Sequence, residues 1–169
     1  MYKFFFYFIG IQFALFSIEQ SVNVHTNIIT PFTEIIAHIS AWIVKLFDDQ
    51  VFSQGVILQQ VDTGFSVSIQ SGCNGVEAVL VLIAAMIAFP SPWKFKLLGI
   101  LGGFFAVELL NIVRIISLFY LGQWNQTVFE WAHLYIWQAL IMLDVLVIFL
   151  LWLRILPPKQ QLVTESHAS

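Results

Sequence analysis

The chain has 169 residues, of which 59% are hydrophobic and only 10% are charged, and its mean hydropathy is +0.86. These values lie outside the range of soluble globular proteins and predict an integral membrane protein embedded in a lipid bilayer. The net charge of −3 is small and the few basic residues are dispersed, which excludes a nucleic-acid-binding surface. No linker, repeat or low-complexity tract divides the chain, so residues 1–169 are expected to form a single domain.

Apolar runs that approach the length of a membrane crossing, about 20 residues, occur four times. They cover residues 4–18, 75–89, 97–121 and 134–153. A further apolar stretch, residues 31–47, contains Glu34, His38, Ser40 and Lys45 and favours an amphipathic helix lying on the membrane. The alternative is that this stretch forms a fifth span.

Basic residues indicate the orientation of these spans, because loops rich in Lys and Arg remain in the cytoplasm. With four spans, one side of the membrane receives Lys3, Lys94, Lys96, Arg154 and Lys159. The prediction is therefore a protein of the cytoplasmic (inner) membrane with both termini cytoplasmic, an extracytoplasmic segment 19–72 and a cytoplasmic tail 154–169. A cleaved signal peptide at the N-terminus is an alternative for the first span, but no A-x-A-like site follows it.

The extracytoplasmic stretch "GVILQQVDTGFSVSIQSG" predicts a short β-hairpin. Phe65, Val67 and Ile69 alternate with polar residues, and Asp62-Thr63-Gly64 supplies a turn. The expected fold is thus an all-α membrane protein of about four transmembrane helices, with an extracytoplasmic amphipathic helix and a short hairpin.

Three chemically capable residues converge at the outer ends of the spans. Cys73, the only cysteine of the chain, opens the second span, Arg114 lies about 10 Å below the outer end of the third, and His133 opens the fourth. A single cysteine excludes an internal disulfide and CxxC chemistry. A lone cysteine is often only packing, but a charged arginine within the apolar run "LLNIVRIISLFYL" is costly and indicates a functional site.

A thiol attacks carbonyl groups as a thiolate, whose formation is favoured by a helix N-terminus or a nearby cation. We expect both for Cys73, with Arg114 stabilising negative charge and His133 transferring protons. Five neighbours have supporting roles. Gly72 and Gly75 allow close approach of a substrate, and Asn74 caps the helix. Glu77 pairs with Arg114, and Asn111 orients it.

Other polar residues have structural interpretations. Glu108 and Asp144 lie deeper in the membrane and are expected to form hydrogen bonds between helices. His25, His38 and His167 are isolated in the sequence. We therefore expect no metal site and no cofactor.

The stretches "SGCNGVEAV", "NIVRIISLFYLG" and "WAHLYIWQALIMLD" resemble the exosortase and archaeosortase family of membrane cysteine transpeptidases, and most closely the compact subtype called exosortase H. The resemblance implies Cys73 as nucleophile, with Arg114 and His133 as the other catalytic residues. It also implies exported protein substrates that end in a short motif resembling IPTLxxWG, a transmembrane helix and a basic tail, together with an unidentified acceptor.

Two alternatives remain open at the level of the sequence. The first is a non-catalytic membrane transport or assembly subunit with a polar path through the membrane, for which replacement of Cys73 would be harmless. The second is a cysteine protease that hydrolyses its substrate, because nothing in the sequence distinguishes water from another acceptor.

Overall fold

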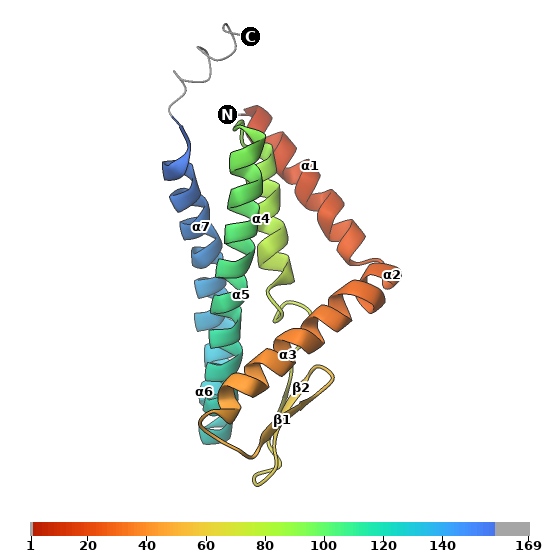
Figure 1. Ribbon diagram of the computed structural model, residues 1–169, viewed down its shortest axis with the longest axis vertical. Helices are drawn as coiled ribbons and strands as arrows, with labels where there is room; N and C mark the ends of the chain where they lie inside the picture. Colours follow the sequence, from red (N-terminus) through yellow and green to blue (C-terminus); the bar gives the residue numbers. More distant parts are fainter. Residues whose placement is uncertain (1, 158–169) are drawn as a thin grey trace, which may run out of the picture.

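The computed structural model describes residues 2–157 of the chain. Helix α1 (Tyr2–Glu19) leads through the short helix α2 (Val22–Val24) and the π-helical turn η1 (His25–Ile29) into α3 (Thr30–Lys45). Figure 1 shows α1 and α3 meeting at an angle near α2, so that α1 lies beside the upper half of the bundle and α3 crosses its lower half.

The upper half is a helical bundle. Helix α4 (Val76–Ala88) packs against α1, against α5 (Trp93–Trp124) and against α7 (Trp137–Ile155). Its buried core combines side chains from α4, α5 and α7, namely Ala78, Val79, Leu82, Met86, Val107 and Trp152. This core fixes the relative heights of the three helices.

The lower half is built on a three-stranded antiparallel sheet in the order β1-β2-β3. Its strands are β1 (Val51–Gln54), β2 (Ile57–Gln60) and β3 (Ser66–Ser68). Helix α3 packs on β1 and β2, and Ile115 and Phe119 of α5 complete a second core with them. The predicted hairpin is confirmed as β2 and β3, whereas β1 was not predicted from the sequence.

Helix α3 is amphipathic, as expected for residues 31–47. Its buried positions follow the helical repeat and are Thr33, Ile36, Ala37, Ser40, Ala41 and Val44. The opposite face exposes large apolar side chains, among them Ile35 and Trp42. The helix therefore suits contact with the sheet on its buried face and with lipid on its exposed face.

Three helices among residues 2–157 are long and apolar enough to cross a membrane, Val22–Lys45, Trp93–Trp124 and Gln126–Ile155. The last two contain the expected spans 97–121 and 134–153. The expected span 75–89 corresponds to the shorter apolar helix α4, and the expected span 4–18 corresponds to α1, which is not among the three. The count of four spans therefore stays a prediction.

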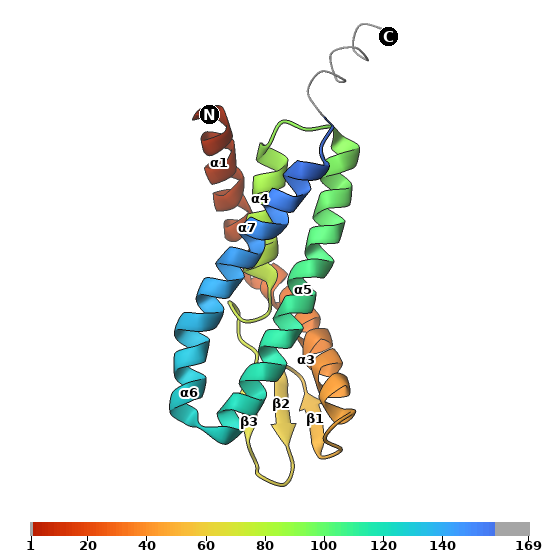
Figure 2. The ribbon, with the colours of Figure 1, turned by 90° about the vertical axis from the view of Figure 1, so that its left-hand side faces the viewer.

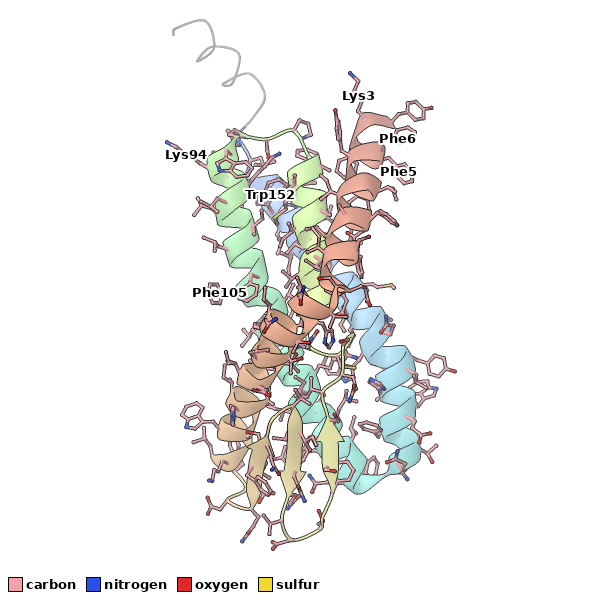
Figure 3. All side chains as sticks on the ribbon, turned by 90° about the vertical axis from the view of Figure 1, so that its right-hand side faces the viewer. Lys3, Phe5, Phe6, Lys94, Phe105 and Trp152 are labelled. Atoms are coloured by element: carbon pink, nitrogen blue, oxygen red, sulfur yellow. The ribbon has the colours of Figure 1, made fainter. Side chains whose placement is uncertain are left out.

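Outward-pointing phenylalanines show where lipid would contact the bundle. Figure 3 shows Phe5, Phe6 and Phe105 directed away from the helices, while Trp152 points inward. Trp152 is 5% exposed and donates its Nε1–H to the C=O of Phe95 at 2.8 Å.

The segment "GQWNQTVFEW", which lies between the expected spans 97–121 and 134–153, is almost entirely helical. Helix α5 continues to Trp124, Asn125 alone breaks it, and α6 (Gln126–Trp131) runs through the π-helical turn η2 (Ala132–Ile136) into α7. The Asn125 side chain accepts a hydrogen bond from the N–H of Val128, so it caps α6.

Most of the expected cytoplasmic tail, 154–169, lies outside the described residues.

Candidate active site

The cysteine lies in a tight turn between β3 and α4. The N–H of Cys73 donates to the C=O of Gln70 at 2.9 Å, and Gly72 has a φ of +83°. Among the described residues only glycines have positive φ, so Ser71 does not, and the turn has the signature of type II. Helix α4 begins at Val76, one residue after the expected start of the span at Gly75, so Cys73 lies in the turn before the helix and not within it.

Two side chains of opposite charge hold the peptide groups of Gly72. The carboxylate of Glu77 accepts a hydrogen bond from the N–H of Gly72, and Nη1 of Arg114 donates to its C=O at 3.4 Å. The expected pairing of Glu77 with Arg114 is not found among the described residues; instead both side chains bind Gly72. The turn is fixed from α4 and from α5 at once.

The sulfur of Cys73 is the point where the three predicted residues meet. Nε2 of His133 lies 3.2 Å from Sγ, and Nη2 of Arg114 lies 3.5 Å from it. Cys73 lies in the turn before α4, His133 in η2 and Arg114 in α5. Their convergence agrees with the prediction made from their depths in the expected spans. A thiol, an imidazole and a guanidinium from three segments are therefore in direct contact.

Arg114 is the most strongly buried charged side chain of this group, with an exposed fraction of 2%. Its two terminal nitrogens contact Cys73 and Gly72, while its Nε has no hydrogen-bond partner among the described residues. The fork of the guanidinium thus points at the sulfur and at the turn. A cation held in a poorly solvated position stabilises nearby negative charge more strongly than it would in water.

The pKa of the Cys73 thiol is raised. Burial raises it most, Arg114 lowers it, and the carboxylate of Glu77 raises it again. The expectation that a cation and a helix N-terminus lower this pKa is therefore not met: Arg114 lowers the pKa, but burial raises it more. The proton has to leave when the thiol reacts, and His133 is in contact to accept it.

His133 lies in a π-helical turn rather than in a regular α-helix. Its ring stacks on that of Phe129, with centroids 5.8 Å apart and an interplanar angle of 17°. The stack limits the orientation of the imidazole while Nε2 faces the sulfur. Single π-helical turns recur at functional sites because they shift side chains out of the regular helical register.

The residues that follow the cysteine anchor the turn. Asn74 is fully buried; its Nδ2 donates to Oγ1 of Thr33 at 3.0 Å, and its Oδ1 accepts from the N–H of Val76 at 3.2 Å. Asn74 therefore satisfies the first N–H of α4, as predicted, although Gly75 occupies the capping position itself. Gly75 has a φ of +82°, and a Cβ there would lie 2.6 Å from a carboxylate oxygen of Glu108. Its small size lets α4 and α5 approach.

Asn111 does not bind Arg114. Its amide donates to Glu108 at 3.5 Å within α5, and its Oδ1 has no partner among the described residues. Asp144 lines a small cavity that Asn111 and Gly75 also line. The hydrogen bonds between helices that were expected for Glu108 and Asp144 are not found among the described residues, since Glu108 bonds only to Asn111 of its own helix.

Sequence reasoning missed one neighbour of the site, His25, which was treated as isolated. Its Nε2 lies 2.9 Å from Oγ of Ser71, the residue two positions before the cysteine. His25 begins η1 and lines, with Ser71 and Gln70, a cleft of about 160 Å³. The 46 residues that separate His25 from Ser71 leave no local signal of this contact.

No group of three His, Cys, Asp or Glu residues that could hold a metal occurs within residues 2–157. His38 hydrogen-bonds Ser53 on β1, and His167 lies outside the described residues.

A polytopic helical fold with a cysteine, a histidine and an arginine in contact defines a membrane-embedded thiol site. Residues 3–158 match the family model described as transmembrane exosortase (Exosortase_EpsH), and the chain belongs to that family. The resemblance noted in the sequence is confirmed at this level. No curated protein and no solved structure matches the chain.

Proposed function

We propose that this exosortase is a cysteine transpeptidase in which Cys73 is the nucleophile, His133 the general acid and base, and Arg114 the oxyanion-stabilising group. Family membership supports a membrane-embedded sorting transpeptidase. The observation that supports the residue roles is the contact of Sγ with His133 Nε2 at 3.2 Å and with Arg114 Nη2 at 3.5 Å.

In the first half-reaction His133 Nε2 takes the thiol proton as Sγ attacks the carbonyl carbon of the scissile peptide. The carbonyl oxygen gains negative charge, which the guanidinium of Arg114 stabilises. When the C–N bond breaks, His133 returns the proton to the departing amine, and a thioester on Cys73 remains. The raised pKa of Cys73 fits this order, because the proton leaves during attack.

In the second half-reaction an acceptor nucleophile attacks the thioester carbonyl. Its proton passes to His133 and then to the sulfur as the C–S bond breaks, which restores the free enzyme. The released product is the exported protein joined to the acceptor, or its free acid when water attacks.

The substrates we propose are exported proteins that end in a motif resembling IPTLxxWG, a transmembrane helix and a basic tail, as for exosortase H. The orientation we propose places the site on the extracytoplasmic side of the inner membrane. Figure 3 shows Lys3 and Lys94 at one end of the molecule, opposite the sheet, which favours that end as the cytoplasmic one.

The test is processing of a co-expressed reporter that carries such a C-terminal tail. Wild type is compared with Cys73→Ala, Arg114→Ala and His133→Ala at matched membrane levels. Cleavage by wild type that all three substitutions abolish supports the assignment, and the mass of the new C-terminus separates transfer from hydrolysis. Cleavage that persists in Cys73→Ala would contradict it and would favour a packing role for the thiol.

A further inference from the structure

The strand that leads to the cysteine lies at an edge of the sheet. In the order β1-β2-β3, strand β3 pairs with β2 on one side only. Figures 2 and 3 show β3 as the strand on the side of α6 and α7, while β1 lies on the side of α3. Helix α3 therefore packs on the β1 side of the sheet, whereas the β3 edge lies on the side of α6 and α7.

The register identifies which backbone groups point out of this edge. The C=O of Phe65 accepts from the N–H of Gln60 on β2, and the N–H of Ile69 donates to the C=O of Val56, which directly precedes β2. Because antiparallel strands alternate between residues that bond their partner and residues that face away, Ser66 and Ser68 direct their N–H and C=O outward. Both residues are exposed.

This edge lacks the features that usually prevent pairing with another chain. Natural edge strands are commonly protected by charges, proline or a covering element. Strand β3 reads Ser-Val-Ser, with no charged residue and no proline. Two residues after its end, Gln70 begins the turn that closes on Cys73. The free edge is thus continuous with the site.

We propose that the free edge of β3 is the recognition site for the exported substrate, whose extended motif pairs with Ser66–Ser68 as a fourth strand and so delivers its scissile peptide to Cys73. This inference rests on the proposed function. Main-chain hydrogen bonds along a strand edge would provide affinity, and alternate side chains of the motif would provide specificity.

The direction of pairing follows from the paths of the two chains. Strand β3 runs toward Cys73 and then into α4, from the sheet toward the helical bundle (Figure 2). A substrate whose motif precedes its transmembrane helix runs the same way, so the added strand is parallel to β3. Four to five further residues, about 15 Å of extended chain, would bring it from Ser68 to the turn.

The first arm of the test removes one outward N–H. Ser68→Pro deletes a donor that β2 does not use, which edge strands tolerate. Ser68→Ala is the matched control, because both changes lose the contact of the Ser68 hydroxyl with Gln70 and only proline loses the N–H. We expect reporter cleavage by Ser68→Pro to fall roughly tenfold or more below that by Ser68→Ala. Equal rates would contradict the inference.

The second arm measures contact without catalysis. Cys73→Ala gives a chain without cysteine. Ser66→Cys or Ser68→Cys is added to it and combined with single cysteines placed along the reporter tail upstream of its transmembrane helix. We expect disulfides from positions 66 and 68 to reporter positions two residues apart and in the same order, with Ser53→Cys on β1 as the negative control.

The outcomes separate the two proposals. Crosslinks in the expected order, with a reporter that wild type leaves uncut, would support substrate binding at the β3 edge and contradict the proposed chemistry. Cleavage by wild type without crosslinks at positions 66 and 68 would refute substrate binding at this edge and leave the proposed chemistry intact. If Ser68→Pro fails to reach the membrane, the crosslinks alone decide, and their reversed order would refute a parallel strand.

Discussion

Replacing Arg114 by lysine keeps the positive charge but removes the fork that serves two partners. In the structure Nη2 contacts the Cys73 sulfur at 3.5 Å and Nη1 contacts the C=O of Gly72 at 3.4 Å. A lysine has one nitrogen and can replace only one of these contacts. Losing a charge-assisted hydrogen bond costs about 1.5–3 kcal/mol, so we expect kcat/KM for reporter cleavage to fall about 10–100-fold.

The assay is the initial rate of reporter processing in membranes with equal amounts of enzyme. Arg114→Gln, which also loses the charge, should fall below Arg114→Lys, and Cys73→Ala sets the background. If Arg114→Lys processes the reporter at the wild-type rate, the fork is not needed and a diffuse positive charge is enough. If Arg114→Gln is as active as wild type, Arg114 has no part in stabilising the oxyanion.

Three further predictions concern the turn and its supports. Burial raises the pKa of Cys73, so the alkylation rate of this single thiol in the folded protein should still increase above pH 8.5, near the ordinary thiol pKa. In the detergent-denatured chain the rate should level off at a lower pH. A plateau at the lower pH for the folded protein would contradict this prediction. Gly75→Ala should lower Tm, since a φ of +82° costs about 1–2 kcal/mol and the new Cβ meets Glu108. Gly102→Ala, where a Cβ meets nothing within 4 Å, is its control, and equal Tm values for the two variants would refute the argument. Asn74→Ala should destabilise the protein by about 1–3 kcal/mol in thermal unfolding, because one buried and one partly buried hydrogen bond are lost, and an unchanged Tm would show that they add no stability.

The parts of the site that the sequence predicts are those set by depth in the membrane. Cys73, Arg114 and His133 each lie at a definite distance from the end of an apolar run, so their convergence follows from helix geometry. The hairpin of β2 and β3 was equally readable, because alternation and a turn are local signals. The amphipathic character of α3 follows from the spacing of its apolar residues.

Other features depend on contacts that no local pattern encodes. The π-helical turns at His25 and His133 have the same apolar spacing as regular helix, so periodicity does not reveal them. The binding of Glu77 to Gly72 arises from the type II turn, which the sequence did not specify. Strand β1 has only four residues, and its pairing is decided by β2 and α3.

The length of α4 has a consequence for the acyl-enzyme. Its 13 residues extend about 20 Å, roughly 10 Å less than the hydrocarbon core of a bilayer. At its far end Lys96 donates to the C=O of Ile87 at 2.7 Å, and the proposed orientation places this end at the cytoplasmic surface. In that orientation the start of α4, and with it Cys73, would lie below the opposite surface, where bulk water is scarcer. A thioester formed there would be shielded from hydrolysis, and its lifetime would depend on the arrival of an acceptor that reaches the same depth.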